Sequence, residues 1–176
     1  MDSVENLLDE VLKFQLTKEK LKHNKARQKF IQDENYGAYV WLHERSYRLH
    51  AFDNIKDKLT DKAYWEILSD IWVDSENIDD FKIEWVILLF YSTRANQKYF
   101  MSERDRKVFD NLPKKITIYR GGSEDGLSWT LDKKKASWFA NRFNRGLSVF
   151  TKSVDKSNCL CYLGGRNEDE IIYYEE

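Results

Sequence analysis

The hydrophobic side chains in the first two-thirds of the chain recur at the spacing of an amphipathic helix. Apolar residues repeat every three or four positions in three stripes, over residues 4–12, 64–72 and 81–89. Because one helical turn takes 3.6 residues, each stripe places its apolar side chains on one face of a helix. We therefore predict a helical portion over residues 1–112, with these stripes forming its core.

Capping residues mark where these helices are expected to begin. Side chains of Ser, Thr, Asp and Asn accept hydrogen bonds from the unpaired N–H groups of a first helical turn. The predicted starts are Asp2 with Glu5, Thr60, Asp79 or Asp80, and Ser102 with Asp105. The helix after Ser102 must end by Pro113, because a proline ring cannot continue a helix.

After Pro113 the hydrophobic positions alternate with polar ones, as they do in strands. The first predicted strand, residues 116–120, stops at two consecutive glycines. Asp132 can cap a helix that ends near Gly146. The other predicted strands are 127–130, 148–154, 159–163 and 170–174, and the apolar face of the helix consists of Ala136, Phe139, Ala140 and Phe143.

This order of elements predicts an α+β fold, with an N-terminal helical segment packed on a small mixed or antiparallel β core. The β-rich portion, residues 113–176, is small enough to be marginally stable alone, so we expect its sheet to need the helices as a cover. No internal repeat or linker-like stretch interrupts the sequence. We therefore expect residues 1–176 to form a single domain.

Composition and charge narrow the class of protein. With 29 Lys and Arg against 30 Asp and Glu, the formal net charge is −1, which excludes a strongly basic or acidic chain. Aromatic residues make up 15% of the 176 positions, too many for a disordered segment. A basic run over residues 13–29 is weakly indicative of nucleic-acid binding, and a solvated helix face is its preferred interpretation.

The sequence carries no feature of a secreted, membrane or metal protein. The amino terminus lacks the basic start and apolar run of a secretory signal, and no stretch has the length to span a bilayer, so we expect a cytoplasmic protein with no membrane partner. The only cysteines, Cys159 and Cys161, are expected to be buried thiols on one face of a strand. With three scattered histidines they offer no ligand set for zinc, and we expect no metal site.

Three polar groups stand where a sheet would favour apolar side chains. Arg120 precedes the two glycines, where a guanidinium and backbone N–H groups can approach a phosphate; a structural ion pair is the alternative. Ser128 and Thr130 place hydroxyl groups on one face of the next strand. If the last strand begins by Glu168, then Glu168 and Glu170 share a face about 6.5 Å apart and can act on one substrate. The alternative for this pair is an acidic edge strand.

The order of these residues resembles the Arg-Ser-Glu class of ADP-ribosyltransferases, an NAD-using family that includes many bacterial toxins and some phage proteins. The resemblance covers residues 116–173 and leaves the rest of the chain unassigned. The residues that carry it are Tyr119-Arg120-Gly121, Ser128-Trp129-Thr130 and Glu168-Asp169-Glu170. It implies the fold of that family for the β core, NAD as co-substrate, and a toxin or phage effector.

The resemblance also implies a role for each residue. Arg120 would hold the NAD phosphates and, with the backbone of Gly121, help to place the nicotinamide ribose. Ser128 would orient Glu170, which would bind the ribose 2′-OH and stabilise the oxocarbenium-like transition state as nicotinamide leaves. Glu168 would position or activate the acceptor. The implied catalytic residues are Arg120, Ser128, Glu168 and Glu170, and the implied NAD-binding residues are Arg120, Gly121, Ser128, Trp129, Thr130 and Glu170.

Some features depart from the family pattern or lie beside it. The middle of the Ser-Thr-Ser-like motif is Trp129, and the loop before the acidic pair, residues 164–167, is short. In the family this loop helps to choose the acceptor, so the acceptor class is left open. Phe139 is expected in the core, whereas Trp138 either faces the ligand or forms a surface cation–π pair with Arg142.

We therefore expect a mono-ADP-ribosyltransferase that cleaves NAD and passes ADP-ribose to a macromolecular acceptor, with protein as the preferred class. Transfer to water would make the chain an NAD glycohydrolase with the same residues. The contrasting class is a catalytically silent binding protein or inhibitor that keeps the same fold.

Overall fold

The structure is a computed structural model, and it describes residues 18, 20–76, 78–142, 146–165 and 167–175. Two compact units make up the chain, Met1–Leu59 and Thr60–Glu176. The stripe over residues 4–12 and its capping pair lie outside the described residues. The single-domain organisation, with its helical and β-rich portions divided at residue 113, stays a prediction.

The first unit is built from short helices. Residues 20–32 are helical, and Asn35 caps the next helix by accepting a hydrogen bond from the Ala38 N–H at 3.2 Å. Lys20, Lys22 and Lys25 are exposed, which agrees with a solvated face for the described part of the basic run. The other elements are α2 (Tyr36–Trp41), η1 (Arg45–Tyr47), α3 (Arg48–Asp53) and η2 (Lys56–Lys58).

Capping residues predicted the starts of two helices in the second unit. Thr60 accepts a hydrogen bond from the Ala63 N–H at 3.2 Å, and Ser102 accepts one from the Asp105 N–H at 3.1 Å. The last of these helices ends before Pro113, as expected. The elements are α4 (Asp61–Asp74), η3 (Ile78–Phe81), α5 (Lys82–Phe90), η4 (Gln97–Phe100) and α6 (Glu103–Asn111).

The predicted cap at Asp79 or Asp80 is wrong. Both residues lie inside the 3-10 turn η3, and α5 follows Phe81 without a side-chain cap. The carboxylate of Asp79 instead contacts the guanidinium of Arg120. A distant tertiary partner has replaced the local one that the sequence suggested.

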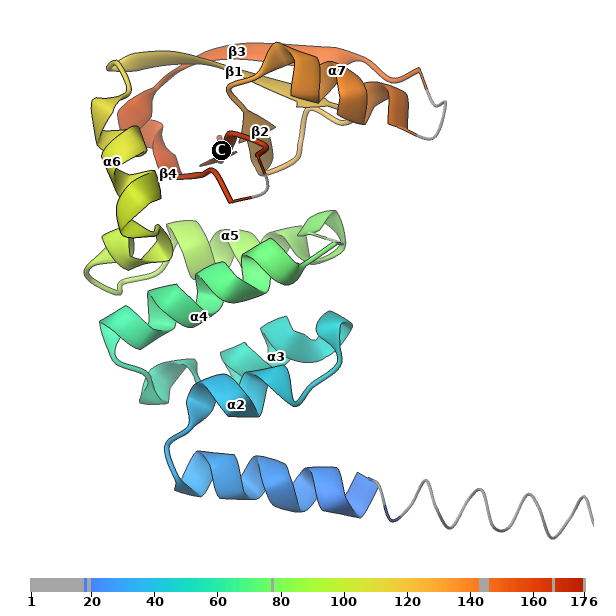
Figure 1. The fold of residues 1–176 in the computed structure, drawn as a ribbon, viewed down its shortest axis with the longest axis vertical. Helices are drawn as coiled ribbons and strands as arrows, with labels where there is room; N and C mark the ends of the chain where they lie inside the picture. Colours follow the sequence, from blue (N-terminus) through green and yellow to red (C-terminus); the bar gives the residue numbers. More distant parts are fainter. Residues whose placement is uncertain (1–17, 19, 77, 143–145, 166, 176) are drawn as a thin grey trace, which may run out of the picture. The chain divides into compact units, whose positions relative to one another are not determined.

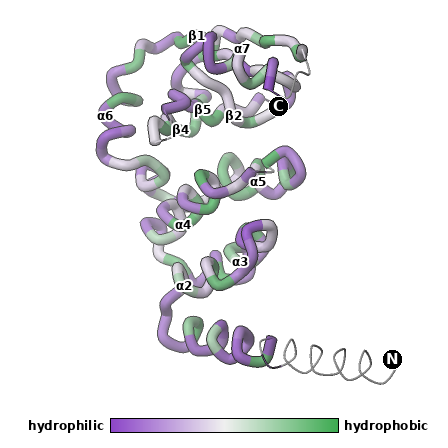
Figure 2. The backbone as a smooth tube through the Cα atoms, turned by 45° about the vertical axis from the view of Figure 1, so that its right-hand side comes forward, coloured by the Kyte–Doolittle hydropathy of each residue, from purple (hydrophilic) through white to green (hydrophobic). Residues whose placement is uncertain are grey.

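Aromatic side chains fill the interior between the helices. The indoles of Trp72 and Trp85 meet edge to face with ring centroids 5.0 Å apart, and Trp65 meets Phe100 in the same way at 6.3 Å. All four are buried. Figure 2 shows hydrophobic positions recurring along α4 and α5, as the two stripes predicted.

A five-stranded antiparallel sheet follows, which confirms the α+β class (Figure 1). Its strand order is β3-β1-β2-β5-β4, so the three strands that carry the motifs are neighbours. Every strand predicted from the alternation is present. The strands are β1 (Lys115–Gly121), β2 (Ser128–Thr130), β3 (Val149–Asp155), β4 (Cys159–Leu163) and β5 (Glu170–Tyr173).

Helix α7 (Lys133–Asn141) packs against β1. Asp132 caps it as predicted, accepting a hydrogen bond from the Lys134 N–H at 2.7 Å. A Cβ atom on Gly121 would lie 2.1 Å from the Ala136 carbonyl oxygen, so the glycine lets helix and strand meet at backbone distance. The helix ends earlier than Gly146, and Phe143 lies outside the described residues.

The two cysteines are buried free thiols, as expected. A bulge lies between Cys159 and Cys161, so the regular alternation that was to place both on one face is interrupted there. Burial raises the pKa of the Cys159 thiol to about 11. Among the described residues, none of the helices combines the length and the hydrophobicity needed to cross a membrane.

Candidate functional site

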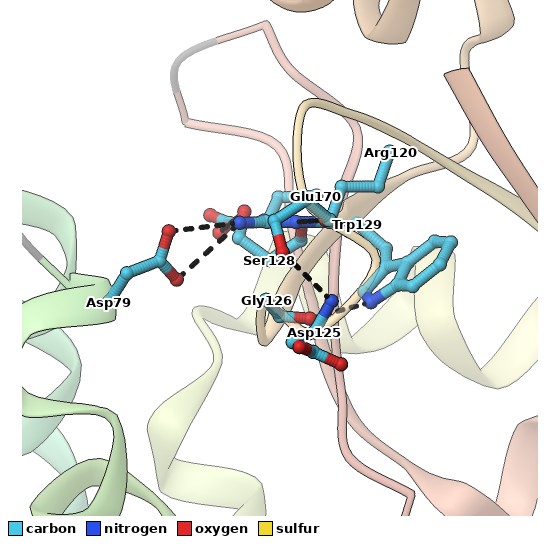
Figure 3. Close-up of polar contacts among 8 residues, drawn as sticks. Asp79, Arg120, Asp125, Gly126, Ser128, Trp129 and Glu170 are labelled. Atoms are coloured by element: carbon cyan, nitrogen blue, oxygen red, sulfur yellow. Dashed lines mark hydrogen bonds and ion pairs between the residues drawn. The ribbon is translucent and has the colours of Figure 1, made fainter. Parts of the chain in front are cut away.

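The carboxylate of Glu170 is held by donors from two different elements. Strands β2 and β5 pair with Ser128 opposite Ile172 and Thr130 opposite Glu170. In this register the Ser128 hydroxyl donates a hydrogen bond to Oε1 of Glu170 (Figure 3). The indole N–H of Trp72, on α4, donates to the same oxygen at 3.2 Å.

Arg120 lies at the end of β1, enclosed by acceptors. Its Nε donates to the Ser123 carbonyl at 2.7 Å, and its Nη1 donates to the Ser128 carbonyl at 2.5 Å. Nη2 donates to a carboxylate oxygen of Asp79 at 3.2 Å (Figure 3). Burial lowers the pKa of the guanidinium, while the carboxylates of Asp79 and Glu170 act in the opposite direction. Since an arginine keeps its proton in proteins, the group is a fixed cation in the site.

The loop between β1 and β2 is shaped around this guanidinium. A Cβ atom on Gly126 would lie 1.8 Å from Cζ of Arg120, so any larger residue there would have to displace the guanidinium. The Gly126 carbonyl accepts a hydrogen bond from the indole N–H of Trp129 at 2.9 Å, which fixes the loop from its other side. Trp129 itself is buried, so the motif position filled by Trp holds the loop by packing.

Glu168 and Glu170 would share a face only if the last strand began by Glu168, and this condition is not met. Strand β5 begins only at Glu170, and Asn167 and Asp169 have φ angles of +55° and +47°. These left-handed residues turn the chain, so period-two alternation does not apply to the pair. The Thr130 hydroxyl donates to the Glu168 carbonyl at 2.5 Å and ties this turn to β2.

Side chains outside the motifs fix the same turn. The phenol of Tyr162, on β4, donates to a carboxylate oxygen of Asp169 at 2.5 Å. Burial, together with this hydrogen bond, raises the pKa of Tyr162 to about 12, so the phenol remains the donor at neutral pH. On α6, Asp105 accepts a hydrogen bond from the Gly164 N–H at 3.1 Å. Asp169, the middle residue of the acidic motif, thus anchors the loop. Glu168 and Glu170, on either side of it, line the cavity.

The residues to which the resemblance assigns a catalytic or NAD-binding role meet at one cavity of about 170 Å³. A second hollow, of about 480 Å³, shares part of this wall and extends to Trp72, Asp79 and Arg142. Together they are large enough for a small organic ligand. The sequence-predicted residues that line the first cavity are Arg120, Gly121, Ser128, Trp129, Thr130, Glu168 and Glu170.

Some residues of the site escaped the sequence analysis. Phe139 is half-buried and lines both hollows, although its place on an apolar helix face predicted a core position. Trp72 and Asp79 were recognised only as a core residue and a cap, because no local signal shows which distant group a side chain will reach. Trp138 is 57% exposed with the Arg142 guanidinium 5.3 Å from its ring centroid, so the surface cation–π interpretation is confirmed.

The described residues contain no group of His, Cys, Asp and Glu side chains that could hold a metal ion. Comparison of the chain with known protein families, curated proteins and solved structures found no significant match. The resemblance to ADP-ribosyltransferases therefore rests on the three motifs.

Proposed function

We propose that the chain is a cytoplasmic mono-ADP-ribosyltransferase that cleaves NAD and transfers ADP-ribose to a macromolecular acceptor, a protein in the preferred case. One observation carries the proposal: the Ser128 hydroxyl donates to Glu170 at the wall of a cavity that Arg120 and Glu168 also line. Three neighbouring strands bring these groups together from positions up to 50 residues apart in the chain.

The proposed reaction breaks the bond between the nicotinamide nitrogen and C1′ of the ribose. The bonding electrons stay with nicotinamide, and positive charge develops on the ribose. A carboxylate held in place stabilises this charge more in the transition state than in the ground state, which is what accelerates a reaction. Glu170 has this position in the proposal because Ser128 and Trp72 both fix its Oε1 atom.

Arg120 supplies the site with a cation for the NAD phosphates. Its Nη2 group pairs with the carboxylate of Asp79, whose side chain is 63% exposed, whereas that of Arg120 is only 14% exposed. An exposed anion on a buried guanidinium occupies the place that a phosphate oxygen would take. The half-buried ring of Phe139 adds an apolar surface for the nicotinamide or the ribose.

The same contact favours the second candidate, a silent binding protein of this fold. Arg120 already donates to Asp79 and to two main-chain carbonyls, as a structural arginine does. In that case the chain binds its partner without turning over NAD. Glu170→Gln then leaves partner binding unchanged, and neither the wild type nor the variant releases nicotinamide.

Nicotinamide release from NAD, with and without a cell lysate, tests the proposal. We expect release that needs the lysate and falls at least about 100-fold in Glu170→Gln, because the neutral amide cannot stabilise the developing cation. Glu66→Gln is the matched control, since this glutamate on α4 is exposed and forms an ion pair with Lys62. No release in either setting rejects the transferase in favour of the binding protein.

Release without lysate would identify the third outcome, an NAD glycohydrolase. Glu168→Gln then tests acceptor handling. For a transferase, this substitution lowers ADP-ribose transfer to the acceptor and, with it, the nicotinamide release that needs the lysate. For a hydrolase, labelling of lysate proteins from labelled NAD is absent in the wild type as well.

A further inference from the structure

Helix α4 sends a buried indole into the site from outside all three motifs. Trp72 lies in the last turns of α4 and is only 2% exposed. Its N–H group donates to Oε1 of Glu170 at 3.2 Å, across 98 residues of sequence. The ring lines the larger hollow beside Ser128 and Arg120.

Glu170 accepts hydrogen bonds from donors on independent elements, Ser128 on β2 and Trp72 on α4. Because both reach the same carboxylate oxygen, rotation of the carboxylate would break both hydrogen bonds at once. A serine hydroxyl alone would be a weaker clamp, since its proton can turn toward another acceptor. An indole N–H has a fixed direction and can only donate.

The packing around Trp72 fixes its ring. Trp85 meets it edge to face with an interplanar angle of 82° and centroids 5.0 Å apart. A buried indole can rarely leave its N–H group without an acceptor, so the ring and the carboxylate determine each other's position. Helix α4 therefore contributes to the geometry of the site from outside the three motifs.

We propose that Trp72 is a positioning residue that holds the Glu170 carboxylate in its catalytic orientation. This inference rests on the proposed function for its effect on rate. It places one determinant of the reaction on a helix that the family resemblance does not cover. Because Trp72 acts through Glu170, its removal lowers the rate of bond cleavage and leaves the affinity for NAD unchanged.

The kinetic test compares Trp72→Phe with Trp65→Phe. Both substitutions replace a buried indole of α4 by a smaller ring and remove the hydrogen bond of its N–H group. Trp72 donates to Glu170, whereas Trp65 donates to the Ala95 carbonyl at 2.8 Å. We expect kcat for nicotinamide release to fall at least about tenfold in Trp72→Phe, the lower end of what one hydrogen bond to a charged group contributes, with KM for NAD within about twofold. Trp65→Phe should keep kcat within about twofold. Equal losses in both variants, or a loss confined to KM, would overturn the inference.

A spectroscopic test needs no activity. In a ¹⁵N–¹H correlation spectrum, the signal missing from Trp72→Phe identifies the indole N–H of Trp72. We expect Glu170→Gln to shift this signal and to increase its hydrogen exchange, and the control Glu66→Gln to leave both unchanged. An indole signal that Glu170→Gln does not move would overturn the contact. If the signal shifts but the protein releases no nicotinamide, the contact between Trp72 and Glu170 stands. The proposed function is then rejected, and with it the proposed effect of Trp72 on the rate.

Discussion

The guanidinium of Arg120 lies directly against Gly126. A Cβ atom added to this glycine would be only 1.8 Å from Cζ of the arginine. The guanidinium therefore rests directly on the main chain of the loop that connects β1 to β2. From this position it reaches the carbonyls of Ser123 and Ser128 on either side of the glycine. The arginine and its loop fit each other, so neither can move alone.

Replacing Gly126 by alanine should displace the guanidinium without removing any charged group. We expect nicotinamide release to fall roughly 100-fold, because a misplacement of about 1 Å in a binding group can cost that much. Gly165→Ala is the control, since nothing lies within 4 Å of the Cβ atom it would add. Full activity in Gly126→Ala would show that Arg120 is not needed at its present position.

The ion pair between Asp79 and Arg120 predicts competition with NAD. Asp79→Asn removes the anion from Nη2, so we expect KM for NAD to fall about threefold, the scale of an ion pair with an exposed partner. Asp80→Asn, on the same 3-10 turn, is the matched control. A higher KM in Asp79→Asn would mean that Asp79 supports the bound state instead of competing with it.

Ser128→Ala removes one hydrogen-bond donor to Glu170 and keeps the strand. We expect kcat for nicotinamide release to fall about tenfold to 100-fold. Combined with Trp72→Phe, the two losses should not multiply, because both residues act on one carboxylate oxygen. Ser137→Ala, on α7, is the control, because its hydroxyl donates to the Lys133 carbonyl of the same helix. Strictly multiplicative losses would argue against a shared clamp.

The hydrogen bond from Tyr162 to Asp169 predicts an alkaline loss of stability. Burial raises the pKa of this phenol to about 12, above the value of about 10 expected in the unfolded chain. The contribution of the protonated phenol to the free energy of unfolding is therefore complete below about pH 10 and is lost as pH rises toward 12. Between these values the free energy of unfolding of the wild type should fall more steeply than that of Tyr162→Phe, as measured by urea unfolding at each pH. Parallel curves would contradict this assignment.

Local signals in the sequence were sufficient for the elements that carry the site. Alternation stopped by glycines predicted β1, and the caps at Thr60, Ser102 and Asp132 form the hydrogen bonds expected of them. Each of these depends on residues within a few positions of one another. For the same reason the helix α7 between the second and third motifs could be predicted.

Contacts across long stretches of sequence could not be predicted. A stripe on α4 shows that the ring of Trp72 is buried, but not that its N–H reaches Glu170. Asp79 looks like a cap because the sequence does not reveal Arg120 as the competing partner. The turn at Glu168 depends on two residues in left-handed conformation, Asn167 and Asp169, which alternation alone does not indicate.

The indole of Trp72 also sets a limit on how the chain can be divided. A piece beginning at residue 113 would keep every motif residue and lose both Trp72 and the anion of Asp79 from its site. The shortest piece that retains them with a complete α4 begins at the Thr60 cap, where the second compact unit starts. The three motifs are therefore not self-sufficient. Grafting β1, β2 and β5 onto another scaffold would transfer the groups proposed to react without the helix whose indole donates to Glu170.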